Sequence, residues 1–201
     1  MDSAGARRTW APSRCDPMLR RDPSRGQDRW AHVLKDGRTC TIRRAFEADA
    51  DALMRNINEI GAEGEYILTE RITATVKHER EWIRSFDDRS SVLYVAEVGG
   101  RVVGQVDVRI PTFEKARHVA NLGIAIIGSF RGVGIGRALM ERALAWMKAR
   151  RVEKATLEVF ATNERAIALY RKMGFEVEAV RKRHYKIRGE YVDDVMMAKW
   201  L

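Results

Sequence analysis

The chain has 201 residues but only two cysteines and four prolines, and it lacks any long apolar run. Cys15 and Cys40 show no metal-ligand or redox spacing, so we expect two free thiols. Every apolar stretch is shorter than the about 18 residues of a membrane-spanning helix, and the N-terminus has no apolar segment typical of a secretory signal. We therefore expect no membrane span and, by default, a cytoplasmic location.

Positive charge is in excess. The 37 Lys and Arg against 28 Asp and Glu give a formal net charge of +9, and residues 1–36 contribute +3 of it. A basic domain suits an anionic partner, whether a nucleic acid, an acidic protein or a phosphorylated cofactor. Charge alone does not choose between these partners.

The residue patterns divide the chain near Gly37. Residues 1–36 combine Arg, Asp, Pro and Ser without apolar periodicity, which predicts a disordered N-terminal extension. A docking arm that uses Trp10 and Trp30 is the alternative. From Gly37 the patterns predict one domain over 37–201, of length sufficient for a sizeable core.

Within that domain the expected order of elements is βααβββαβαββ, an α+β fold with a mixed central sheet. Alternation and turn signals predict strands at 39–45, 91–97, 101–110, 118–126, 154–161, 175–187 and 190–201. Apolar spacing predicts helices at 47–60, 76–86, from about 135 to 150, and 163–173, with a loop-like insertion at 61–73.

The segment RGVGIGR, Arg131–Arg137, places three glycines directly before a predicted helix. A helix start offers unpaired N–H groups and a partial positive charge, so it can bind an anion that the absence of side chains allows to come close. Arg131 adds a charge that could fork onto a phosphate oxygen. The segment is not a Walker A loop, because it lacks Lys-Ser/Thr, and it is not a dinucleotide fingerprint, because the third glycine is missing.

A second segment, LEVFATNERAIALYRKMGF, follows at 157–175. Asn163, Ile167 and Tyr170 have the spacing i, i+4 and i+7, which predicts one helical face with Asn163 and Tyr170 about 10 Å apart. A long, thin ligand could touch both residues. The alternative for Tyr170 is a core tyrosine with a satisfied hydroxyl.

Together these segments resemble the GNAT (Gcn5-related N-acetyltransferase) family, over about Gly37 to Leu201. The resemblance implies a GNAT-like mixed sheet flanked by helices, with a splayed cofactor strand, and acetyl-CoA as co-substrate whose acetyl group passes directly to an amine. By resemblance, the strand edge would bond the pantetheine arm and the glycine loop would hold the pyrophosphate. The implied cofactor-binding residues are Ile124, Ala125, Ile126, Arg131, Gly132, Val133, Gly134, Ile135, Gly136, Arg137, Asn163 and Tyr170.

For the chemistry, the resemblance makes Tyr170 the acid that stabilises the leaving thiolate. With a thiol pKa of about 8.5 and a tyrosine pKa of about 10, full proton transfer costs about 2 kcal/mol, so we expect a shared hydrogen bond. The amine must be neutral to attack, which at pH 7 costs a lysine-like amine about 4.6 kcal/mol but an α-amine only about 1 to 1.4 kcal/mol. Candidate bases are Glu158, which the resemblance favours, and Glu70, with Glu65, His118, Asp193 and Asp194 left open.

We expect an N-acetyltransferase whose acceptor is a small amine or an amino acid. The alternatives are an acetyltransferase of protein N-termini, such as those of ribosomal proteins, and an acyl-CoA-binding regulator without turnover. The chain is also loosely similar to bacterial small-molecule members of the family, but it has Asn121 where these often have an acidic residue. Residues 61–73 and the last hairpin are expected to choose the acceptor. The cationic run Arg181–Gly189 is expected to be a solvated hairpin, nucleic acid is not an expected partner, and a homodimer is compatible with the sequence.

Overall fold

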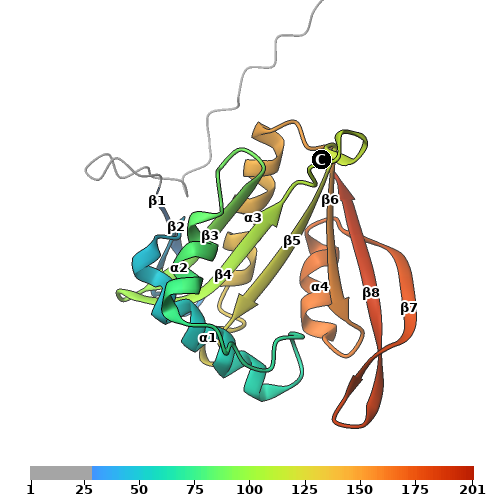
Figure 1. The fold of residues 1–201 in the computed structure, drawn as a ribbon, viewed down its shortest axis with the longest axis horizontal. Coiled ribbons are helices and arrows are strands. Elements are labelled where there is room, and N and C mark those ends of the chain that lie inside the picture. Colours follow the sequence, from blue (N-terminus) through green and yellow to red (C-terminus); the bar gives the residue numbers. More distant parts are fainter. Residues whose placement is uncertain (1–28) are drawn as a thin grey trace, which may run out of the picture.

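A mixed sheet of eight strands, in the order β1-β2-β3-β4-β5-β6-β8-β7, forms the centre of the protein. The computed structural model describes residues 29–201. Figure 1 shows helices on both faces of the sheet. The strands are β1 (Arg29–Val33), β2 (Thr39–Arg44), β3 (Ser91–Val98), β4 (Arg101–Arg109), β5 (Val119–Ile126), β6 (Lys154–Phe160), β7 (Glu176–Ile187) and β8 (Glu190–Trp200), and the helices are α1 (Ala50–Glu63), α2 (Val76–Arg84), α3 (Ile135–Ala149) and α4 (Glu164–Lys172).

The predicted α+β class and the predicted order of elements from Thr39 onward are confirmed. The expected boundary at Gly37 needs correction, because β1 precedes it and pairs with β2 along its whole length. Trp30 is only 6% exposed and packs edge-on against Tyr94, with ring centroids 5.8 Å apart. A five-residue strand is too short to show a clear period in the sequence. Residues 1–28, with Trp10 and Cys15, lie outside the described residues.

The two faces of the sheet are covered by different helices. Side chains that alternate along a strand point to opposite faces, so Val106 and Val108 of β4 join the large core with α3. Leu93 and Val95 of β3 join a smaller core with α1 and α2 on the other face. None of the helices within residues 29–201 has the length and apolarity to cross a bilayer.

Strand β5 separates from β6 after a short parallel ladder. The ladder has three pairs, which end at Asn121↔Thr156. β4 accompanies β5 to Ile126, so the other edge of β5 is free from Leu122 onward. The two strands diverge plainly in Figure 1. The expected splay of the cofactor strand is therefore confirmed.

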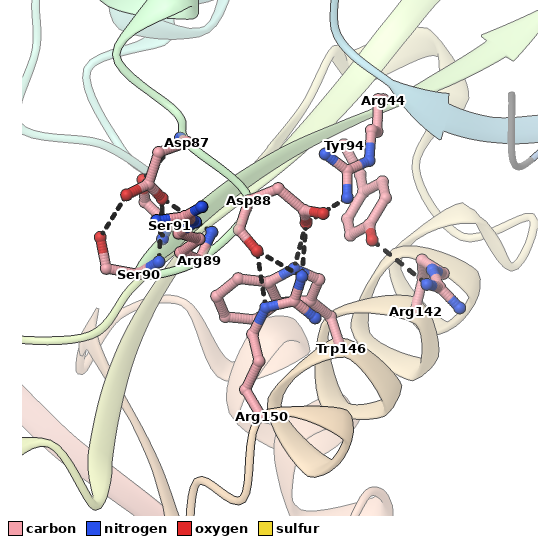
Figure 2. A network of polar contacts seen from close by, with 10 residues as sticks. All are labelled: Arg44, Asp87, Asp88, Arg89, Ser90, Ser91, Tyr94, Arg142, Trp146 and Arg150. Carbon is pink, nitrogen blue, oxygen red and sulfur yellow. Dashed lines mark hydrogen bonds and ion pairs between the residues drawn. The ribbon is translucent and has the colours of Figure 1, made fainter.

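A polar network anchors the far end of α3 to the start of β3 (Figure 2). Asp88, whose φ of 61° lies in the left-handed region, accepts a 2.8 Å hydrogen bond from the Trp146 indole and a 2.8 Å hydrogen bond from Arg150 to its carbonyl. Arg44 also pairs with its carboxylate. The neighbouring Asp87 accepts three backbone N–H groups of the turn at 2.8 to 3.1 Å. This network fixes one end of α3, whose other end carries the glycine loop.

Candidate active site

The glycine loop presents a row of unused backbone donors. The N–H groups of residues 132–137 donate no hydrogen bond within the described part of the chain. Gly134 is the N-cap of α3 with φ 112°, and Gly132 has φ 84°, conformations that side chains rarely adopt. A 15-residue helix adds its partial positive charge at this end. The loop is thus built to take an anion on its backbone.

Two cationic or titratable side chains that the sequence analysis missed lie against this loop. A Cβ on Gly132 would overlap the guanidinium of Arg165, from the first turn of α4. A Cβ on Gly134 would lie 3.6 Å from His32 Nε2 of β1, and the Lys35 N–H bonds the carbonyl of Val133 at 2.9 Å. The sequence signal for Arg165 was its place two residues after Asn163. His32 had none, because β1 was not predicted.

Arg131 is bound to other groups of the protein. Its Nη1 and Nη2 donate to the Glu63 carboxylate at 2.6 and 2.7 Å, and its Nε donates to the Ile126 carbonyl at 2.8 Å. The guanidinium also stacks on Tyr66, 4.2 Å from the ring centroid. Three of its five donors therefore form a clamp between β5 and α1, and two N–H donors remain for the expected contact with a phosphate.

The other predicted cofactor residues lie on β5 and at the start of α3. Ile124, Ala125 and Ile126 are half-buried on the free edge of β5. Ile135 is buried behind the loop, and Gly136 allows close packing, because a Cβ there would lie 3.0 Å from Leu169 of α4. Arg137 is exposed and pairs with Glu141 of its own helix.

Asn163 and Tyr170 lie at opposite ends of α4. Asn163 is the N-cap and not part of the helical face as predicted, because its Oδ1 accepts the Ala166 N–H at 3.1 Å. Tyr170 is only 5% exposed and packs near Phe175, with ring centroids 6.1 Å apart. Burial raises the pKa of the Tyr170 phenol far above its usual 10. The Tyr170 hydroxyl donates no hydrogen bond to a described residue, and its oxygen keeps some exposed surface.

The candidate bases differ in what they contact. Glu158 pairs with Arg181, which also pairs with the fully buried Asp194. Asp193 accepts from Lys182 and from a backbone N–H at 2.8 Å each. His118 is exposed at the closed end of the splay, where β5 and β6 still pair, and Glu65 is exposed. Glu70 lines a cavity.

That cavity, of about 370 Å³, lies between the insertion and the last hairpin. It combines apolar and aromatic walls with two cations and one carboxylate. Its lining residues are Gly61, Ala62, Gly64, Ile67, Leu68, Glu70, Phe160, Tyr185, Lys186, Ile187 and Arg188. The two segments that were expected to choose the acceptor therefore meet in one cavity.

The chain that carries this loop, free strand edge and cavity is similar to known proteins. Residues 60–175 match the model of the Acetyltransferase (GNAT) family. The chain belongs to this family. It also superimposes with a TM-score of 0.76 on a GNAT acetyltransferase from Streptococcus pneumoniae, at 26% identity over 81% of this chain and 99% of that one.

Named relatives agree with the GNAT assignment. The chain is 32% identical over 165 residues to the L-amino acid N-acetyltransferase AaaT of Escherichia coli, covering 79% of this chain and 96% of AaaT. It is 35% identical over 176 residues to an N-alpha-acetyltransferase of Sulfurisphaera tokodaii, covering 82% and 95% of the two chains. A ribosomal-protein-alanine N-acetyltransferase from Brucella melitensis superimposes with a TM-score of 0.73 at 30% identity, over 80% of this chain and 99% of that one. The predicted activity, N-acetyl transfer from acetyl-CoA to an amine, is thus confirmed at the level of the family.

Proposed function

We propose that this GNAT acetyltransferase acts on the α-amine of a free amino acid with an apolar side chain. The observation that carries the proposal is the cavity of about 370 Å³ beside the splay, a volume that suits a small molecule. Phe160 and Tyr185 provide an aromatic wall, with ring centroids 5.1 Å apart. Lys186 and Arg188 add positive charge for a carboxylate, and Glu70 is the one carboxylate in the lining.

An α-amine also matches the chemistry. Its pKa of about 7.7 to 8.0 leaves a usable neutral fraction at pH 7, unlike the lysine-like amine of pKa about 10.4. AaaT, which covers nearly the same length, is named for L-amino acids. Both considerations favour a free amino acid over a lysine side chain.

For the co-substrate, the proposal assigns the pyrophosphate to the backbone of residues 132–137, with Arg165 as the covering cation. The free edge of β5 at Ile124–Ile126 would pair with the amide-bearing arm, and the unused Nδ2 of Asn163 offers a further donor. Acetyl-CoA supplies an activated acetyl thioester. The residues of this chain hold it in place and exclude water from it.

Tyr170 is the proposed partner of the leaving sulfur. Because burial raises the pKa of its phenol, full proton transfer to a thiolate of pKa about 8.5 is more costly than the about 2 kcal/mol expected from the sequence. Tyr170 then acts as a hydrogen-bond donor whose phenol stays protonated at neutral pH.

A protein N-terminus is the second candidate acceptor, because several similar proteins are named N-alpha-acetyltransferases or ribosomal-protein acetyltransferases. One contact disfavours it here. Arg188 of the last hairpin donates a 2.7 Å hydrogen bond to the Glu63 carbonyl of α1, and this bridge between two sides of the cavity suits a small acceptor better than a polypeptide.

The cytoplasmic location and the homodimer stay predictions. Part of the charge on the cationic hairpin is neutralised, since Arg181 and Lys182 pair with carboxylates. This supports the expectation that nucleic acid is not a partner.

The proposal is tested by incubating the protein with acetyl-CoA and a panel of amines, and by detecting the released CoA thiol. We expect the highest kcat/KM with apolar α-amino acids. Tyr170→Phe should lower kcat about 10²-fold while acetyl-CoA affinity stays within about twofold. If the wild-type protein binds acetyl-CoA but releases no CoA with any amine, the proposed function is wrong.

A further inference from the structure

Strand β4 presents two polar side chains, Gln105 and Asp107, to the α1 side of the sheet. They lie two residues apart and so share a face. Val106 and Val108, which alternate with them, are buried in the core with α3. Gln105 and Asp107 therefore point away from that core, toward the face that α1 and α2 cover.

Asp107 lies where β5 leaves β6. Its cross-strand neighbours are Leu93 on β3 and Gly123 on β5. A Cβ on Gly123 would lie 2.9 Å from Asp107 Oδ1, so the carboxylate lies against the glycine where a side chain would otherwise stand. Gly123 follows closely after Asn121, the last residue of β5 that pairs with β6. The carboxylate is therefore beside the first part of the free edge.

Both side chains have unused hydrogen-bonding capacity. Gln105 is 7% exposed, and its enclosed Oε1 has no partner within residues 29–201. The Asp107 carboxylate receives no hydrogen bond from another side chain of the described residues. A buried acceptor without a donor is unfavourable. An ammonium group, with its N–H donors, matches the Asp107 carboxylate.

The surroundings make Asp107 a better proton acceptor than an ordinary aspartate. Burial raises its pKa, and the charge of Arg109 on the same strand offsets part of the increase. Its neighbours Leu93, Gly123 and Asn121 are uncharged. Glu79 is the titratable residue that α2 buries on this side, and burial raises its pKa too. A carboxyl with a raised pKa is suited to general-base work near neutral pH.

We propose that Asp107 accepts the proton that the acceptor ammonium must lose. The proposal rests on the proposed function, since it needs an amine acceptor. First, one N–H bond breaks and its proton moves to the Asp107 carboxylate. The nitrogen lone pair then forms the C–N bond to the acetyl carbon, while the C–S bond breaks and its electrons stay on sulfur. A second nitrogen proton ends on the sulfur, and Asp107 returns its proton to water.

Two other residues near the splay are less suited to accept the proton. Glu158 is paired with Arg181. Asn121, the last residue of β5 that pairs with β6, is an amide and cannot take a proton. Asp107 reaches the same region from the neighbouring strand because Gly123 leaves room for it.

The test compares Asp107→Asn with Asp51→Asn, a matched change at an exposed position of α1. We expect Asp107→Asn to lower kcat/KM for the amine at pH 7 by about 10²-fold or more, with the Kd for acetyl-CoA within about twofold. The rate of the Asp107→Asn protein should rise tenfold per pH unit up to the pKa of the amine, whereas the wild-type rate should level off at a lower pH. Asp107→Glu should recover part of the activity, and Asp51→Asn should behave as the wild type.

An Asp107→Asn protein with wild-type kcat/KM and an unchanged pH profile would overturn the assignment while leaving the proposed function in place. Failure of the proposed function looks different, because then the wild-type protein itself releases no CoA with any amine. Acetyl-CoA binding, measured by calorimetry, shows in both cases that the proteins are folded.

Discussion

Two arginines near the glycine loop, Arg131 and Arg165, make different contacts. Arg131, which the sequence marks as the phosphate ligand, is held by Glu63 and by the Ile126 carbonyl. Arg165, which carries no motif, contacts Gly132 at the loop itself. A charge in a motif shows that a cation is present, but only the fold shows which way its side chain turns.

At the residue scale we predict that Arg165→Gln raises the KM for acetyl-CoA about tenfold, with kcat within about twofold. The reason is the loss of one charge-assisted contact to the pyrophosphate, worth about 1.5 to 3 kcal/mol. Arg171→Gln, on the exposed surface of the same helix, is the control and should leave the KM unchanged. Steady-state kinetics with varied acetyl-CoA measure both values. An unchanged KM in Arg165→Gln would show that the loop binds its anion without this side chain.

At the scale of elements, the sequence predicted most strands and helices because their signals are local. Alternation marked β3 and β4 around Gly99-Gly100, and apolar spacing marked α3. The exception was β1, whose short strand is stabilised by contacts distant in sequence, such as the packing of Trp30 on Tyr94. The capping of α4 by Asn163 follows the known preference of asparagine for the N-cap position. The sequence analysis placed Asn163 on a ligand-binding face instead and so did not predict the cap.

The turn before β3 gives a pH-dependent prediction. Hydrogen bonds from the backbone of Ser90 and its neighbours lower the pKa of Asp87 to about 2, below the about 3.9 of an unfolded chain. A lowered pKa stabilises the folded protein above the unfolded pKa, and this stabilisation is lost as the pH falls from about 4 through about 2.

We therefore expect Asp87→Ala to lower the free energy of unfolding at pH 7, and the difference from the wild type to shrink between pH 4 and pH 2. Urea unfolding at several pH values measures this difference. Asp51→Ala, on the exposed face of α1, serves as the control. A difference that stays constant down to pH 2 would contradict the role given to the Asp87 carboxylate.

At the scale of the whole molecule, the contribution of β1 to the stability of the fold can be tested. Chains that begin at residue 29 retain β1, whereas chains that begin at Gly37 lose Trp30 and Leu34, which are 6% and 3% exposed. Removing such side chains costs about 2 to 5 kcal/mol each. We expect the shorter chain to unfold at a markedly lower Tm, measured by circular dichroism. Equal Tm values for the two chains would mean that β1 adds nothing to the core.

The sequence predicts the overall architecture of the site better than the contacts of its individual side chains. The place of the glycine loop before α3, the place of Tyr170 on α4 and the splay follow from two motifs and a family resemblance. The roles of the loop and of Tyr170 stay predictions. The clamp on Arg131, the contact of His32 with the loop and the carboxylate of Asp107 against Gly123 depend on pairings between strands and helices far apart in the chain. No local pattern encodes such pairings.

The central claim is that the cavity between α1 and the last hairpin takes a free amino acid. The most direct measurement compares kcat/KM for one apolar amino acid with that for a tripeptide that begins with the same residue, both with saturating acetyl-CoA. Because Lys186 and Arg188 offer charge to a free carboxylate, we predict a preference for the amino acid of about tenfold or more. A higher kcat/KM for the tripeptide would contradict the account and assign the protein to the acetylation of polypeptide N-termini.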